Sequence, residues 1–528
     1  MNMKMIAAAC VAFCGVSAFA AVTPSCNAAA AAADGVTLLK TCAPEITFYG
    51  AGATAMKGAI QTALVKKDDA GQVIVSSAVF DITKPLVTIN LSGNTNAYAY
   101  YGFGAAGTAW VGKKVAVIIN GTNGSMAGVN QLLSGLKQGS IENGVDQKEY
   151  ITIQLHTAAA QKAGTAMPDT DVTVNTASAL APVVTLAATR VADFKTAWGV
   201  DKQKVAHMAF SDVRPSEATP GQIAKWTPAS FPSETIAMQG FGVVVNNNMY
   251  KALMARDVRE GQITDAACDS SDASMLLAQC QPSITTADYT ALMTGKTTSA
   301  AQFLRDTAET RVLSLNRRPN SSGTQAATQI MFAGQANYYG KTPLATGFDM
   351  AGYDSAVMLI TQDGQTTVSM NTEQVVNAGF KVITNVGTGD LIKKVQGDTT
   401  GLSIGVASLD NKAASKFGPG NKTAASPDLE TARWVQLNRL TPNFKPDGTV
   451  DSTQRAALQA GYPFAFEFQT IKSAALAGEY SGIYSAIVNS LKDPSFNLTG
   501  IGYIGSADAA KNTVWTRGGN NNFPLNKY

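Results

Sequence analysis

One stretch of the chain joins a hydrophobic run, a turn of small polar residues and a helix-compatible run, and it constrains the fold more than any other. Residues 312–315 are mostly apolar, residues 318–324 begin with Arg318 and continue with Ser, Gly and Thr, and residues 325–332 suit a helix. The N–H groups at the start of such a helix, with hydroxyls and an arginine beside them, would form a site for a tetrahedral oxyanion. The same residues would also cap an ordinary helix, and the stretch alone leaves both interpretations open.

The order of strand, small-residue turn and helix occurs elsewhere in the chain. Residues 45–49 have strand-forming character and lead into Gly-Ala-Gly-Ala-Thr at 50–54, which precedes a helical pattern. A glycine-rich turn at 100–108 follows an aromatic run, and a short apolar strand at 207–210 ends beside Asp212. Strands that alternate with helices, without an internal repeat, predict an α/β fold with mixed or parallel sheets.

Length and composition narrow the class of protein. A chain of 528 residues exceeds the usual size of a single core, so we expect at least two domains or lobes. The net charge of +3 gives no sign of a nucleic-acid partner or a membrane-surface partner. The two histidines, His156 and His207, offer little for a catalytic triad or a metal centre. We therefore expect neither enzymatic activity, nor a metal, nor a cofactor.

The N-terminus has the three parts of a secretory signal peptide. Lys4 supplies the positive charge, residues 5–16 form the apolar core, and residues 17–20 end in the small-x-small pattern that a signal peptidase cuts. The apolar run is shorter than the roughly 20 residues that a spanning helix needs. We expect cleavage after Ala20 and a location in the periplasm or outside the cell, without a membrane span.

The cysteines of the exported chain predict disulfides. Of the six cysteines, two lie in the signal segment, which leaves Cys26, Cys42, Cys268 and Cys280. An even number in an exported chain favours disulfide bonds, and their spacing does not suit zinc. The pairs Cys26–Cys42 and Cys268–Cys280 are the simplest of the three possible connectivities.

Five short motifs follow one another along the chain. They are Gly-Ala-Gly-Ala-Thr at 50–54, the glycine-rich turn at 101–107, Phe-Ser-Asp at 210–212, Met-Thr-Gly-Lys at 293–296 and Arg-Pro-Asn-Ser-Ser-Gly-Thr at 318–324. In this order they resemble the motifs of the periplasmic phosphate-binding protein of bacterial ABC transporters, a type II periplasmic binding protein. The resemblance implies an α/β fold of two lobes with mixed sheets, joined by a hinge of crossing strands near 240–246 and 400–410.

The resemblance also implies a division of the chain. The signal peptide at 1–20 and an N-terminal extension at 21–43 precede the first lobe. That lobe is expected to comprise residues 44–242 and 400–528, with an insertion at about 108–206. The second lobe is expected to comprise residues 243–399, with an insertion at about 255–283.

The same resemblance implies a ligand set for phosphate or a related oxyanion. Arg318 would donate charged hydrogen bonds, and Asp212 would accept one from a protonated ligand oxygen. An anion without a proton, such as sulfate, would be repelled by that carboxylate. The remaining donors would be hydroxyl or N–H groups of Thr54, Ala55, Ser322, Gly323 and Thr324, with weaker candidates at Ala105 and Ser321. The implied partner is an ABC transporter permease.

Several positions depart from the family pattern. Ala105 replaces a serine, Ala55 replaces an aromatic residue, Asn320 replaces an aspartate that would brace Arg318, and Ser321 replaces a glycine. Together with the insertions, these departures keep a second function open: a secreted or cell-surface structural protein with reduced or lost ligand binding. Arg317, beside Arg318, is expected to face solvent.

Overall fold

The structure of the protein is a computed structural model. It describes residues 34–53, 57–65, 77–92, 94–121, 124–133, 151–153, 167–177, 181–187, 191–193, 206–212, 230–318, 322–333, 359–362, 365–368, 373–385, 387–411, 432–445, 447–451, 458, 461–493, 500–503, 515–516 and 526–527.

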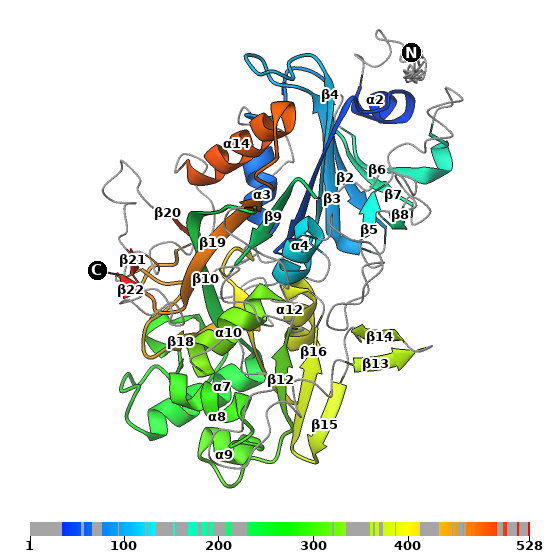
Figure 1. Ribbon diagram of the computed structural model, residues 1–528. Helices are drawn as coiled ribbons and strands as arrows, with labels where there is room; N and C mark the ends of the chain where they lie inside the picture. Colours follow the sequence, from blue (N-terminus) through cyan, green and yellow to red (C-terminus); the bar gives the residue numbers. More distant parts are fainter. Residues whose placement is uncertain are drawn as a thin grey trace, which may run out of the picture.

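A mixed sheet of 16 strands forms the frame of the molecule. Figure 1 shows its strands passing from the upper part to the lower part, with helices packed against both. In sheet order, the upper part contains β6 (Val172–Thr176), β7 (Val183–Leu186), β2 (Leu86–Leu91), β3 (Asn94–Phe103), β4 (Lys114–Asn120), β1 (Ile46–Gly52), β9 (Met208–Ser211) and β19 (Ala465–Lys472). The path continues through β10 (Ser233–Asn246), β17 (Leu402–Ser408), β12 (Leu313–Arg317), β16 (Phe380–Thr384) and β15 (Glu373–Asn377).

The remaining strands are short. Three of them lie off the main path and pair with β10 or with one another: β11 (Ser283–Ile284), β18 (Ala432–Leu437) and β20 (Ile501–Tyr503). Three separate two-stranded pairs are β13 (Leu359–Gln362) with β14 (Gln365–Val368), β5 (Ile151–Ile153) with β8 (Val191–Asp193), and β21 (Trp515–Thr516) with β22 (Asn526–Lys527).

The long strand β10 connects the two parts of the sheet. Its first half, up to Gly240, pairs antiparallel with β19, and its second half, from Phe241, pairs antiparallel with β17. The change of partner therefore falls between Gly240 and Phe241. These are the crossing strands that the sequence predicted near 240–246 and 400–410.

Helices cover both faces of the upper part of the sheet. Strand β1 shows why, because Phe48 packs into one core and Tyr49 into another. Successive side chains of a strand point to opposite faces, and a strand that is apolar at every position needs cover on both. The covering helices are α2 (Gly35–Thr41), α3 (Lys57–Leu64), α4 (Gly124–Leu133) and α14 (Gly478–Lys492).

The lower part has its own core, in which Trp434, Leu313 and Ile404 are fully buried. Asn246 caps the first helix after β10, since its side chain accepts a hydrogen bond from the Met249 N–H at 3.0 Å. The helices of this part are α7 (Asn247–Arg259), α8 (Thr286–Met293), α9 (Ala300–Leu304), α10 (Gly323–Ala333) and α12 (Thr388–Gly397).

The strand pairing differs from the predicted division of the chain. Residues 108–206 were expected to form an insertion, but β4 lies in the middle of the sheet and pairs parallel with β1. Residues from 400 on were expected in the first lobe, but β17 pairs with β12 and β18 with β11. A buried parallel strand is apolar throughout wherever it sits, so composition alone does not reveal its neighbours.

Two further predictions concern cysteines and membranes. Cys268 and Cys280 lie with their sulfur atoms at bonding distance, 1.94 Å. Cys42 is also disulfide-bonded, and its predicted partner Cys26 lies outside the described residues, as does the signal segment. Within the described part of the chain, no helix has both the length and the apolar character needed to cross a membrane.

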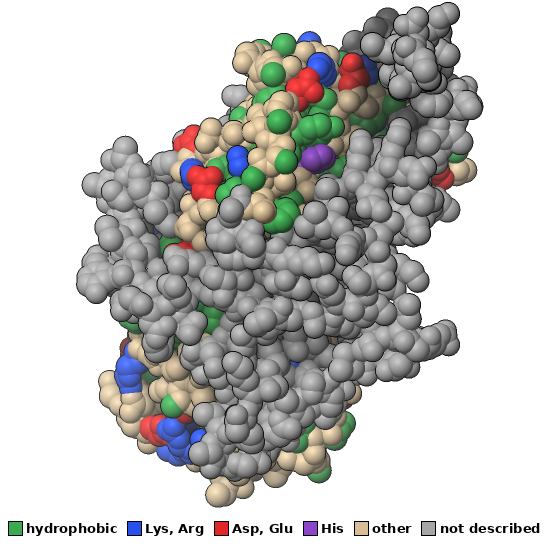
Figure 2. Space-filling model, in the orientation of Figure 1, with side chains coloured by type: hydrophobic (Ala, Val, Ile, Leu, Met, Phe, Trp, Pro, Cys, Tyr) green, Lys and Arg blue, Asp and Glu red, His purple; other side chains and the backbone are tan. Residues whose placement is uncertain are grey.

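The charged side chains are spread over the surface. On the face in Figure 2, positive and negative groups of the described residues lie near one another in both parts of the molecule. This distribution agrees with the small net charge of +3 and gives no single-sign patch on the described part of that face.

Candidate functional site

Three parallel strands of the upper part end at one edge of the sheet. The register pairs Ala51 with Asn120 and Gly52 with Phe210, so β1, β4 and β9 reach this edge together. Helix α4 begins at Gly124, soon after β4, and Asp212 follows β9 directly. The carboxyl ends of parallel strands are where α/β folds commonly bind ligands, because turns and helix N-termini converge there.

The Asp212 carboxylate accepts hydrogen bonds from two different elements at this edge. Its residue is 1% exposed, and its carboxylate accepts hydrogen bonds from the hydroxyls of Ser125 and Thr324. Burial raises the pKa of the Asp212 carboxyl, while the Ser125 hydrogen bond, the Arg318 charge and the Thr324 hydroxyl oppose that rise. The carboxylate is thus held among donors in a dry environment.

The start of α10 lies directly against this carboxylate. A Cβ atom added to Gly323 would lie 1.8 Å from Asp212 Oδ1 and 2.4 Å from Ser125 Oγ, so only glycine fits. Ser322 precedes the helix and accepts the Ala326 N–H through its backbone oxygen at 3.0 Å. Two of the predicted residues, Gly323 and Thr324, therefore lie beside Asp212, and Ser322 comes directly before them.

Arg318 follows β12 at the matching edge of the lower part, and it is 1% exposed. Its Nε donates to the Asn385 backbone oxygen at 3.0 Å, and its Nη1 donates to Thr388 Oγ1 at 2.7 Å. Burial lowers the pKa of Arg318 to about 10, and the charges of Asp212 and Asp390 act in the opposite direction. The guanidinium therefore keeps its charge at neutral pH.

In the structure Asn385 and Thr388 hold the Arg318 side chain, the role that an aspartate at position 320 has in the family pattern. Asn385 follows β16, which runs parallel to β12, and Thr388 is the first residue of α12. Asn320 itself lies outside the described residues. The sequence showed α12 as a capped helix, but it gave no sign that the helix start faces Arg318.

The prediction that Arg317 faces solvent is wrong. The residue is 5% exposed, and its Nε donates to the Arg318 backbone oxygen at 3.0 Å. It ends β12, and Tyr289 and Met293 of α8 line one cavity together with Arg317, so α8 covers this face of the sheet. Arg318 also lines this cavity of about 20 Å³, which has room for about one water molecule.

Ala105 lies away from Asp212. The register pairs Phe103 with Lys114 at the start of β4, whereas Asp212 lies at the other end. A strand of seven residues spans roughly 20 Å. The Ala105 N–H donates to the Val79 backbone oxygen at 3.1 Å. The fold does not bring this position to the site.

Ser125 is the hydroxyl that the sequence reasoning missed. It follows the hydrophobic run at 114–120 and is the second residue of α4, so the order of strand, short connection and helix is the one found at the other site motifs. That order was the sign that could have identified it. Ser125 thus places at Asp212 a hydroxyl that Ala105 does not supply.

Three predicted residues, Thr54, Ala55 and Ser321, lie outside the described residues. The turn that leads to the first two is described up to Ala53. Gly52 has a φ of 130°, and a Cβ there would lie 2.0 Å from the Phe210 backbone oxygen. This turn therefore requires glycine, as the sequence suggested.

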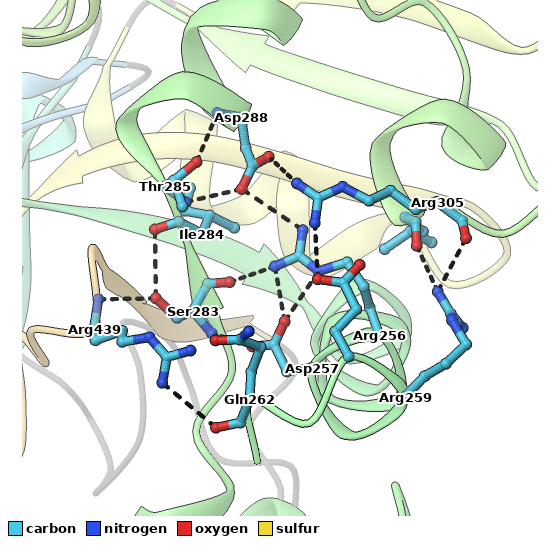
Figure 3. Close-up of polar contacts among 12 residues, drawn as sticks. Arg256, Asp257, Arg259, Gln262, Ser283, Ile284, Thr285, Asp288, Arg305 and Arg439 are labelled. Carbon is cyan, nitrogen blue, oxygen red and sulfur yellow. Dashed lines mark hydrogen bonds and ion pairs between the residues drawn. The ribbon is translucent and has the colours of Figure 1, made fainter.

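A second cluster of charged residues lies in the lower part and is shown in Figure 3. Arg256 pairs with Asp257 at 2.9 Å, and Arg305 contacts Glu260 at 2.8 Å and Asp288 at 3.0 Å. Each of these carboxylates is paired with an arginine of the chain, so the cluster joins α7, α8 and the end of α9. Among the residues that the structure describes, no group of three or more His, Cys, Asp or Glu could hold a metal ion.

Comparison with known proteins gives distant structural likenesses. No family model matches the chain, and no curated protein matches it. A Clostridium perfringens protein assigned as a phosphate ABC transporter substrate-binding protein, solved with bound phosphate, has 12% identity and a TM-score of 0.34, covering 85% of this chain and 94% of its own.

Two other solved structures are an ABC-type phosphate transport receptor from Vibrio cholerae and a phosphate-binding protein from Stenotrophomonas maltophilia. Their identities are 11% and 14%, and their TM-scores are 0.26 and 0.28. They cover 58% and 55% of this chain, and 82% and 70% of their own lengths. At these TM-scores the likenesses carry no weight for function, which has to be inferred from the chain's own geometry.

Proposed function

We propose that this protein binds phosphate or a related oxyanion between Asp212 and Arg318. The observation that supports the proposal most is the buried guanidinium of Arg318, which Asn385 and Thr388 hold in place beside the start of α10. A fixed arginine next to a helix N-terminus is a strong donor set for a tetrahedral anion.

In this proposal each group has a distinct role toward the ligand. Arg318 donates charged hydrogen bonds, and the N–H groups at the start of α10 add neutral donors. The hydroxyls of Ser125 and Thr324, which now donate to Asp212, turn to the ligand oxygens. Asp212 then accepts a hydrogen bond from a ligand oxygen that carries a proton. A fully ionised anion would face the buried carboxylate, at a cost of roughly a few kcal/mol.

The two parts of the molecule supply different halves of the site. Asp212 and Ser125 come from the upper part, and Arg318 and Thr324 come from the lower part. The strands β10 and β17 cross between the parts, so a small change near Gly240 would separate or close the two halves. Closure on a ligand about crossing strands is the motion expected of a two-lobed binding protein.

Isothermal titration calorimetry with phosphate, and separately with sulfate, tests the proposal. Arg318→Ala should lower phosphate affinity at least about a hundredfold, because charged hydrogen bonds contribute roughly 1.5–3 kcal/mol each. Arg311→Ala is the control, since Arg311 pairs with Glu309 away from the site. Absence of heat with both anions in the unmodified protein would disprove oxyanion binding.

The transport role forms a second part of the proposal. An exported binding protein of this kind would deliver its ligand to an ABC transporter permease, after cleavage of the signal peptide behind Ala20. N-terminal sequencing of the exported protein and fractionation of the cells test this part. A chain that keeps residues 1–20, or that remains inside the cell, would contradict it.

One observation favours a second candidate function. The hydroxyls of Ser125 and Thr324 already donate to Asp212, and Gly323 packs against the same carboxylate. These contacts join the two parts directly, as expected of a secreted or cell-surface structural protein on this fold. Surface association that persists in Arg318→Ala, together with no anion binding, would support this candidate.

A further inference from the structure

Asp410 is a buried carboxylate at the point where the chain passes between the two parts of the molecule. The Leu409 N–H donates to the Gly240 backbone oxygen at 2.9 Å, where β10 changes partner, and Asp410 comes next. The residue is 7% exposed. It forms no ion pair with any described residue, which is unusual for a buried carboxylate.

The carboxylate of Asp410 lies at the start of α3. A Cβ added to Gly58, the second residue of that helix, would lie 3.9 Å from Asp410 Oδ2. The Ser408 hydroxyl and the Gly58 N–H both act to lower the pKa of this carboxyl. Asn411 Nδ2 lies 3.5 Å from its Oδ1. The hydrogen-bond donors that the described residues place around this carboxylate are thus neutral.

The charged and titratable groups that face Asp410 come from three elements. The charge of Asp212, which follows β9, raises the pKa of Asp410, and the charge of Asp410 in turn raises the pKa of Tyr98 on β3. Lys57 begins α3, with its Nζ 5.5 Å from the centre of the Tyr98 ring, and burial lowers the pKa of that lysine. Burial and the Asp212 charge together raise the pKa of Asp410 to about 7.

Helix α3 follows β1, whose carboxyl end pairs with β9 just before Asp212, so Asp410 at the start of α3 lies at the same edge of the sheet as the proposed site. With Asp212 ionised, an incoming oxyanion adds further negative charge to a dry region. That addition is strongly unfavourable unless a proton accompanies it. Asp410 is the group placed to take the proton, because the charge of Arg318 stabilises ionised Asp212, whereas Asp410 has no cation partner among the described residues.

We propose that Asp410 is a proton-binding residue of the oxyanion site, so that the protein takes up a proton on this carboxyl when it captures its ligand. This inference rests on the proposed function and gives it a further property, namely that binding weakens as the pH rises above neutral. The proton can sit on Asp410 or move to the ligand. The proton count of the complex is the same in both cases, and it is the quantity that linkage measures.

Calorimetry on the full exported chain tests the proposal with inorganic phosphate as the probe. Titrations at a pH of about 8, in two buffers with different ionisation enthalpies, give the number of protons taken up. The unmodified protein should take up about one proton more than Asp410→Asn. Asp410→Asn should also bind phosphate about tenfold more tightly at that pH, because its amide never ionises. Asp447→Asn, at an exposed turn, is the matched control.

Each outcome decides a specific point. Equal proton uptake in the unmodified protein and in Asp410→Asn, with phosphate bound by both, overturns the inference and leaves the proposed function standing. No phosphate binding by either protein from about pH 6 to about pH 8 overturns both. If Asp410→Asn does not fold, Asp410→Ser replaces it, and uptake near zero in the unmodified protein alone is enough to reject the inference.

Discussion

Thr324 Oγ1 lies 3.3 Å from Asp212 Oδ2, and this hydrogen bond joins the two parts of the molecule. Asp212 ends β9 in the upper part, and Thr324 is the second residue of α10 in the lower part. The same carboxylate also accepts the Ser125 hydroxyl. One buried carboxylate therefore connects two of the hydroxyl donors on which the proposed binding depends.

Gly323→Ala should break the contact between α10 of the lower part and Asp212 of the upper part. Its Cβ would fall 1.8 Å from Asp212 Oδ1, and real Cβ atoms do not approach other atoms so closely. We expect phosphate affinity to fall at least about tenfold and the radius of gyration to rise, while each part keeps its core. Calorimetry and small-angle X-ray scattering measure the two effects.

The control for this substitution is Gly397→Ala, because no atom lies within 4 Å of a Cβ at Gly397. That variant should match the unmodified protein in both measurements. Unchanged affinity and unchanged scattering in Gly323→Ala would show that the contact at Asp212 is not needed for binding or for closure.

Asp212→Asn should change which anions bind. The amide has no charge and can donate a hydrogen bond, so a fully ionised anion is no longer repelled. We expect sulfate binding to appear and the preference for phosphate over sulfate to shrink at least about tenfold. Competition of the two anions in calorimetry measures the ratio. Asp265→Asn, at an exposed position, should leave the ratio unchanged, and a preference that survives in Asp212→Asn would assign selectivity to other groups.

Much of the fold follows from patterns that the sequence displays. The apolar runs that became β1, β12 and β17 were each followed by small residues and a helix or turn, and this order predicts an α/β fold. Arg318 and Asp212 were identified because each follows such a run. Side-chain type and distance from a strand end are local properties, so sequence reasoning can reach them.

The errors came from neighbours that sequence order does not specify. Arg317 is buried because another element, α8, lies over that face of the sheet, with Tyr289 and Met293 lining the same cavity. Ala105 was named because the turn at 101–107 resembles a loop of the family, yet only the register of β3 against β4 shows which turn reaches Asp212. Partners such as Thr388 and Asp410 become visible only once the two parts are assembled.

Thr388→Val should weaken both the fold and the site. The substitution removes the hydroxyl that accepts Arg318 Nη1 at 2.7 Å, which leaves a buried N–H without that partner. The expected loss of stability is about 1–3 kcal/mol, and a less fixed guanidinium should weaken phosphate binding several-fold. Urea unfolding and calorimetry measure the two losses. Thr399→Val, at an exposed position, is the control, and stability equal to that control would mean that Arg318 needs no support from α12.

The stability of the protein without ligand should depend on pH through Asp410. Its pKa is raised to about 7 in the folded protein, whereas the pKa of an aspartate in the unfolded chain is roughly 3.9. Between these values the folded state binds more protons, so the free energy of unfolding falls as the pH rises from about 4 to about 7 and then levels off. This contribution is fully present below the unfolded pKa and is lost above the folded one.

Asp410→Asn should remove this contribution, which flattens the profile by an amount on the order of a few kcal/mol. Urea unfolding at a series of pH values measures both profiles, with Asp447→Asn as the control. Parallel profiles for Asp410→Asn and the unmodified protein would show that Asp410 is ionised across this range, because a group with no shift contributes no slope.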